Sequence, residues 1–185
     1  MLRYNIIYLL VCCLLTTINA VSHDQFEEKL KLLPLKIQVS NIRIANMSKT
    51  STLLISCIDF RLVDETERLM SQVFGLIDDY DQITLPGASL ALVADQYPHW
   101  GKTINDIVDI ALQLHNIKRI ILLDHRDCGA YKLIQGSNGH HDHISETKQH
   151  KEVMLKAKKV LQDKFPKLKI YTLLLGLDGK VENLE

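Results

Sequence analysis

The stretch TLLISCIDFR, residues 52–61, joins a continuous apolar run to three side chains that can carry chemistry. The apolar part has the length of a strand and no polar alternation, which predicts a strand covered on both faces, as in a parallel sheet. Cys57, Asp59 and Arg61 follow where the run stops. Because sites in such sheets form beyond the carboxyl ends of the strands, these residues are candidates for a functional site.

A second stretch, KRIILLDHRDCGA over residues 118–130, repeats the pattern. Its apolar run predicts a buried strand over residues 118–124, and His125 follows directly. Cys128 comes three residues after His125, a spacing at which a tight turn can grip one metal ion. If the two strands are parallel neighbours, Cys57 lies beside His125 and Cys128 although many residues separate them.

The remaining patterns alternate between helix and strand. Helices are predicted over residues 24–33, 62–74, 103–115 and 146–165, and further strands over residues 82–85 and 169–175. Residues 88–94 are expected to form one or two helical turns, residues 95–102 and 135–142 loops, and residues 176–179 a turn. The alternation predicts an α/β fold, a mostly parallel β-sheet flanked by helices and joined by right-handed crossovers.

Two of the helices carry detailed expectations. The helix over 62–74 is expected to bury one face, made of Leu62, Thr66, Leu69, Met70, Val73 and Phe74. The helix over 103–115 is expected to begin with a capping box of Thr103 and Asp106 and to end at Asn116. Its inward residues are expected to be Ile104, Ile107, Val108, Ala111 and Leu114.

The N-terminus has the pattern of a secretory signal peptide. Arg3 supplies a positive charge, residues 6–15 are apolar, and the stretch ends at Ala20 with small and polar residues. We therefore expect a signal peptide over residues 1–20, a helix and linker over 21–50, and one domain over 51–185 that carries both motifs. Export, to a bacterial periplasm, follows; the alternative is an uncleaved N-terminal anchor.

Composition narrows the function. Lys and Arg number 22, as do Asp and Glu, and no basic run stands out, which argues against nucleic acid as a partner. Nothing after residue 20 supports stable membrane association. Two of the four cysteines lie within residues 1–20, which leaves Cys57 and Cys128. An exported domain with two cysteines often forms one disulfide, but the neighbouring His125, Asp59 and Arg61 favour a metal site.

Two thiolates and one imidazole are the ligands of a catalytic Zn²⁺ with an open fourth position, here Cys57, His125 and Cys128. Zinc lowers the pKa of a water in that position, less so when two thiolates neutralise its charge. Asp59 and Arg61 are two residues apart, so on an extended segment both point the same way. Arg61 can hold the Asp59 carboxylate with two hydrogen bonds, and the held Asp59 can orient that water. A free Asp59 could instead ligate the zinc and close the site.

With these residues the chain resembles the β-class carbonic anhydrases from about Leu53 to the C-terminus. The family's zinc ligands match Cys57, His125 and Cys128, and its catalytic aspartate–arginine pair matches Asp59 and Arg61. The resemblance implies reversible hydration of carbon dioxide to bicarbonate, and homodimers or higher homo-oligomers. Two other readings stay open: a related zinc hydrolase acting on a carbon dioxide analogue such as carbonyl sulfide, and a non-catalytic zinc-binding or thiol protein of the same fold.

The chain departs from the family pattern in places. Asp124 stands where family members usually have glycine, TLPG over residues 84–87 replaces a usual arginine–asparagine–alanine–glycine stretch, and the family's substrate-contacting glutamine has no match. Three histidines around residue 142 could bind a second metal but fit a solvated loop better: His140, His141 and His143. Tyr97, His99 and Trp100 could line a pocket or an interface, and partial burial alone explains them equally well.

Overall fold

A computed structural model describes residue 28 and residues 49–136 and 142–185. The fold below is that of the compact unit Ile44–Glu185. The expected signal peptide over residues 1–20 and most of the expected helix over 24–33 lie outside the described residues. Among the described residues, no helix has both the length and the apolar character needed to cross a bilayer.

A five-stranded sheet forms the centre, in the order β2-β1-β3-β4-β5. Its first four strands are parallel and closely match the predicted ranges: β1 (Thr52–Ser56), β2 (Asp81–Thr84), β3 (Arg119–His125) and β4 (Lys169–Leu175). The sequence had not predicted β5 (Val181–Asn183), which follows the turn after Gly176 and pairs antiparallel with β4. The mostly parallel α/β fold is confirmed.

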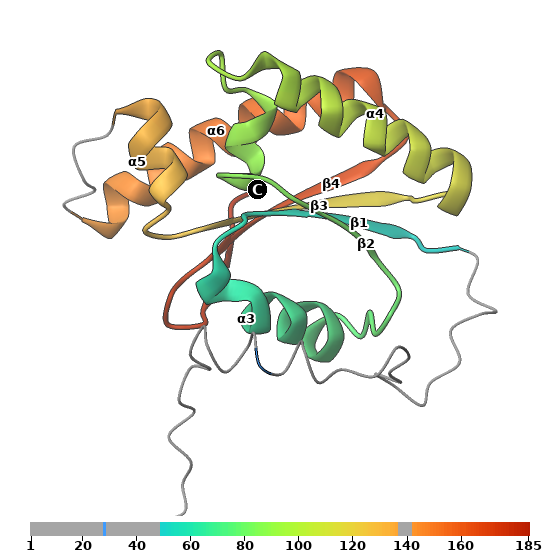
Figure 1. Cartoon of the computed structure of the whole chain (residues 1–185), viewed down its shortest axis with the longest axis horizontal. Helices are drawn as coiled ribbons and strands as arrows, with labels where there is room; N and C mark the ends of the chain where they lie inside the picture. Colours follow the sequence, from blue (N-terminus) through green and yellow to red (C-terminus); the bar gives the residue numbers. More distant parts are fainter. Residues whose placement is uncertain (1–27, 29–48, 137–141) are drawn as a thin grey trace, which may run out of the picture. The chain divides into compact units, whose positions relative to one another are not determined.

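Helices cover the sheet on both faces (Figure 1). Helices α4 (Pro98–His115) and α6 (His143–Lys164) pack on one face, and α3 (Val63–Arg68) packs on the other. Successive residues of β1 alternate between the two cores, with Leu53 and Ile55 in the first and Leu54 in the second. All three are completely buried, which explains why the strand is apolar throughout.

The segment predicted as a helix over 62–74 is less regular than expected. A 3₁₀ turn (Phe60–Leu62) precedes α3, and a π-helical turn (Leu69–Val73) follows it. The Phe74 N–H bonds to the Leu69 carbonyl, five residues back rather than four. The wider turn rotates the last residues outward, so Val73 is exposed and Phe74 partly so, against the prediction.

The helix predicted over 103–115 begins earlier, at Pro98. The prediction of a loop over 95–102 is therefore wrong from residue 98 onward. Helix α4 starts at Pro98, in a first-turn position that suits proline. Thr103 is therefore inside the helix and donates to the His99 carbonyl instead of capping (2.9 Å). Leu114 is exposed rather than inward. Asn116 ends the helix in a left-handed conformation, as predicted.

Two short helices lie near the carboxyl ends of β1 and β3. The predicted helical turns over 88–94 form a 3₁₀ helix, η4 (Ala88–Leu92). Helix α5 (Gly129–Gln135) directly follows Cys128 and had not been predicted. Residues 137–141, in the middle of the expected loop over 135–142, lie outside the described residues. Helix α6 then begins at His143, after the cap residue Asp142, whose carboxylate accepts the Ser145 N–H (2.8 Å).

Candidate metal centre

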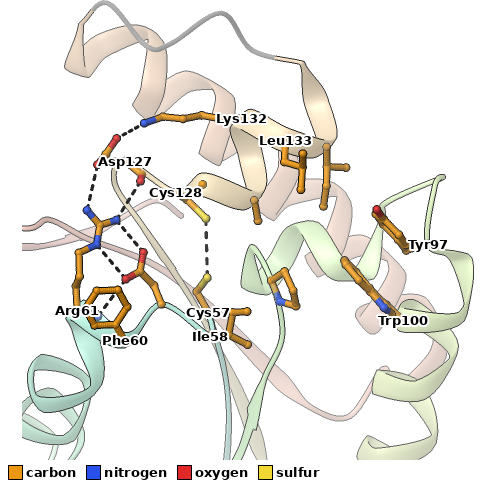
Figure 2. Close-up of a pocket in the computed structure, with 15 residues that line it drawn as sticks. Cys57, Ile58, Phe60, Arg61, Tyr97, Trp100, Asp127, Cys128, Lys132 and Leu133 are labelled. Carbon is orange, nitrogen blue, oxygen red and sulfur yellow. Dashed lines mark hydrogen bonds and ion pairs between the residues drawn. The ribbon is translucent and has the colours of Figure 1, made fainter. Parts of the chain in front are cut away.

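Cys57, His125 and Cys128 meet at the carboxyl ends of β1 and β3. One ligand-type atom from each lies within 4.8 Å of the others. The sulfurs of Cys57 and Cys128 are 3.9 Å apart, and Figure 2 shows these two side chains pointing toward each other. An S–S bond measures about 2.05 Å, so these thiols are not joined. His125 and Cys128 are buried, and Cys57 is partly accessible. Within residues 49–136 and 142–185, these three form the only close set of three or more metal-ligand side chains.

The orientation of His125 fits a metal ligand. Its Nδ1 lies 2.8 Å from the Arg126 carbonyl oxygen, to which it can only donate. The proton on Nδ1 leaves a lone pair on Nε2, and Nε2 is buried without a hydrogen-bond partner. Metal-bound histidines commonly donate their second ring nitrogen to a carbonyl in this way. A buried bare nitrogen facing two thiols is the donor set of zinc, so the residues present fit that ion.

The two thiols are electrostatically linked. The pKa of Cys57 is lowered to about 4, chiefly by a hydrogen bond from the Cys128 thiol and also by the Gly87 N–H. The same contact, together with burial, raises the pKa of Cys128. Without a metal, the pair therefore keeps one proton between two sulfurs. A divalent cation would compensate both negative charges and release that proton.

Glycine at position 87 lets the backbone approach Cys57. The Gly87 N–H donates to the Cys57 sulfur at 3.3 Å. Gly87 has a φ of +77°, and a Cβ there would lie 3.0 Å from the Leu90 Cβ and 3.4 Å from the Ala130 Cβ. Both the conformation and the space therefore favour glycine.

Asp59 and Arg61 form a fork beside the three ligands. Arg61 Nε and Nη2 donate to the two carboxylate oxygens of Asp59 at 3.0 and 2.7 Å. The sequence predicts an extended segment here, but the chain forms a turn instead. Asp59 caps this turn, Phe60–Leu62, and its carboxylate accepts the Arg61 N–H (3.0 Å). The Arg61 hydrogen bond is the main reason that the pKa of Asp59 falls to about 2. Asp59 Oδ2 lies 3.7 Å from His125 Nε2, so a fixed anion borders the candidate metal position.

Asp127 holds the other side of Arg61. Its carboxylate and its backbone carbonyl each accept from the guanidinium at 3.2 Å, and Lys132 pairs with the same carboxylate (Figure 2). Asp127 has a φ of +55°, which bends the chain between His125 and Cys128. Asp127 therefore both supports Arg61 and shapes the turn between His125 and Cys128.

A cavity of about 750 Å³ opens over these residues. Its wall is mostly apolar and includes Ile58, Pro86, Leu133 and the stacked rings of Tyr97 and Trp100 (Figure 2). Of the three aromatic residues singled out in the sequence, His99 does not line it. Phe60 and Leu133 at this cavity are largely exposed. Of the histidine-rich segment, His140 and His141 lie outside the described residues, and His143 opens α6.

Residues 47–185 match the model of a family described as "Putative carbonic anhydrase". The chain is 53% identical over 149 residues to an uncharacterized protein of Rickettsia bellii, an alignment that covers 80% of this chain and 90% of the relative. It is 52% identical over 149 residues to an uncharacterized protein of Rickettsia conorii, covering 80% of each.

Two solved structures share the fold. The carbonic anhydrase of Streptococcus mutans is 17% identical with a TM-score of 0.51, covering 88% of this chain and 93% of that one. The carbonic anhydrase of Glaciozyma antarctica is 15% identical with a TM-score of 0.50, covering 90% and 98%.

Proposed function

The chain belongs to the carbonic anhydrase family whose model matches residues 47–185, and on that premise we propose that it catalyses the zinc-dependent, reversible hydration of carbon dioxide to bicarbonate and a proton. One observation carries the proposal. Two thiols and a bare imidazole nitrogen converge within 4.8 Å, and an aspartate fixed by arginine stands beside them. A purely structural zinc site would need a fourth protein ligand and no such pair.

Cys57, His125 and Cys128 would hold the ion and leave its fourth position open. When bound, zinc supplies a Lewis acid that makes a water molecule nucleophilic near neutral pH. Asp59 would orient that water by accepting a hydrogen bond from it. Its pKa of about 2 keeps it an acceptor at any working pH, and the fork with Arg61 fixes its position.

The cavity suits the reactant and the product differently. Carbon dioxide is small and apolar, and the wall around Ile58 and Trp100 offers it apolar contacts next to the ligands. Bicarbonate is charged and is less well accommodated there, which favours its release. The proton leaves to buffer through the open mouth. Because Asp59 is already ionised, we expect a rise of activity with pH to follow the ionisation of the zinc-bound water and not that of Asp59.

Stopped-flow hydration of carbon dioxide, on protein of measured zinc content, tests the proposal. Asp59→Asn should keep its zinc and lose about a hundredfold in rate, the size of effect of a positioned acid–base group. The matched control is Asp64→Asn, the same change at an exposed position on α3. Zinc-loaded protein that is inactive toward carbon dioxide but active on carbonyl sulfide would support the hydrolase alternative. Inactivity toward both would support a non-catalytic zinc protein.

We also propose a homodimer as the minimal unit and export to the periplasm. Phe60, Val63 and Leu133 leave large apolar side chains exposed, as expected of a surface covered by a second subunit. Light scattering tests the dimer, and a stable, active monomer would contradict it. N-terminal sequencing of protein recovered from the producing cells tests export, since a mature chain should begin after Ala20.

A further inference from the structure

A buried carboxylate lies directly behind the metal ligands. Asp124, the residue before His125, is buried. Its Oδ1 accepts the Ser89 N–H at 3.0 Å, and the Ser89 hydroxyl lies 2.7 and 2.6 Å from its two oxygens. A buried carboxylate is costly unless its oxygens are satisfied, so these contacts are firmly required by the fold.

Two further buried side chains complete the cluster. The Tyr131 hydroxyl donates to Asp124 Oδ2 at 2.5 Å, and His150 Nδ1 lies 3.0 Å from the same oxygen. Tyr131 is on α5, three residues after Cys128, and His150 is on α6. Asp124 therefore joins the end of β3 to both helices and to η4.

The same segment of η4 also reaches Cys57. Gly87, two residues before Ser89, donates its N–H to the Cys57 sulfur. Gly87 and Ala88 both have positive φ, a conformation that a non-glycine residue such as Ala88 adopts only when its surroundings hold it. The hydrogen bonds from Ser89 to Asp124 restrain the backbone immediately after Ala88 and so stabilise its positive φ.

We propose that Asp124 is a positioning residue that sets the zinc affinity of the site, by fixing Cys57 relative to His125 and Cys128. The connection runs from the Cys57 sulfur through Gly87 and Ser89 to Asp124, which adjoins His125. A second branch runs through Tyr131 toward Cys128. One carboxylate thus links the thiolate at the end of β1 to the two ligands that follow β3. The inference rests on the zinc site of the proposed function.

A carboxylate offers only acceptor oxygens to Ser89, Tyr131 and His150. Asparagine could still accept from Ser89 but would place an NH₂ group where Tyr131 and His150 now meet a carboxylate oxygen, so both side chains would have to change their hydrogen bonding. Ser89→Ala keeps the backbone N–H and removes only the hydroxyl. The two changes should therefore loosen the link to different degrees.

Zinc affinity measured by competition with a chromogenic chelator tests the proposal without an activity assay. Asp124→Asn should raise the zinc Kd about 10- to 100-fold, the usual effect of removing a group that orients metal ligands, and Ser89→Ala should raise it less. With Co²⁺ in place of zinc, both variants should show altered thiolate charge-transfer and d–d bands.

Leu161→Ala is the matched control. Leu161 is buried on α6 about three turns beyond His150, so its truncation should destabilise the fold without touching the cluster. An equal loss of affinity in Leu161→Ala, or unchanged affinity and spectra in the folded Ser89→Ala, would overturn the proposal. If Asp124→Asn does not fold, Ser89→Ala decides alone. A wild-type protein that binds zinc tightly yet lacks activity contradicts the proposed function, and weakened binding in the variants would still support this inference.

Discussion

Replacing Arg61 by lysine separates the charge of this residue from its geometry. The Arg61 side chain donates two hydrogen bonds to Asp59 and two to Asp127, and lysine keeps the charge but not the planar fork. A hydrogen bond to a charged group contributes about 1.5–3 kcal/mol, and Arg61 is about one-third exposed, which favours the low end. Losing one bond to Asp59 then lowers the population of the productive orientation roughly tenfold, since a tenfold change corresponds to about 1.4 kcal/mol.

We therefore expect Arg61→Lys to reduce the rate of carbon dioxide hydration roughly tenfold while zinc content is unchanged. Arg61→Ala should cost about a hundredfold, because Asp59 loses both side-chain bonds, keeps only the backbone N–H of residue 61, and can turn toward the open metal position. Stopped-flow rates at equal zinc loading measure both changes. Arg68→Lys, which alters an exposed arginine paired with Glu65 on α3, is the control.

A second readout of Arg61→Ala does not depend on catalysis. Arg61 is the main cause of the low pKa of Asp59, so the pKa should rise from about 2 toward its ordinary value in the variant. Carbon-detected NMR titration of the Asp59 carboxyl follows this change. Wild-type rates in Arg61→Lys would refute the argument from geometry, and an unchanged pKa of Asp59 in Arg61→Ala would refute the pairing itself.

Three further outcomes are expected. Cys128→Ser should lose most of the zinc that elemental analysis finds at about one ion per wild-type chain; equal metal in both proteins would exclude Cys128 as a ligand. Gly87→Ala should be less stable by roughly 1–2 kcal/mol in denaturant unfolding, because its φ is +77° and a Cβ would meet Leu90; unchanged stability would show that the turn adapts. Chelation in air should consume free thiols and slow zinc reloading until reductant is added, since the sulfurs of Cys57 and Cys128 are only 3.9 Å apart; a constant thiol count argues against this.

The central sheet could be predicted because each buried strand is a continuous apolar run with a clear end. Thr52–Ser56 and Arg119–His125 are the clearest examples, and the alternation of strands with helices predicted that the strands run parallel. The short edge strand β5 was missed because Val181–Asn183 is exposed and carries no apolar pattern. The predicted start of helix α4 lies too late in the sequence because Pro98 and Gly101 are typical loop residues. Proline nevertheless fits the first turn of a helix.

The sequence predicted that Cys57, His125 and Cys128 lie close together, because they follow the ends of parallel strands and are typical zinc ligands. What holds them could not be predicted, because it depends on contacts between distant segments. Gly87 reaches Cys57 across thirty positions, and Ser89 meets Asp124 across thirty-five. The sequence marked Asp124 only as an unusual residue before the histidine. Positive φ at Asp127, which lets this residue hold Arg61, likewise emerges only from the folded turn.

The most direct test of the account is the rate of carbon dioxide hydration by the wild-type protein at pH 8 to 9, measured by stopped flow at known zinc content. The account predicts activity proportional to bound zinc, rising with pH through this range and largely lost in the zinc-depleted Cys128→Ser variant. A fully zinc-loaded protein that hydrates carbon dioxide no faster than buffer alone would contradict it.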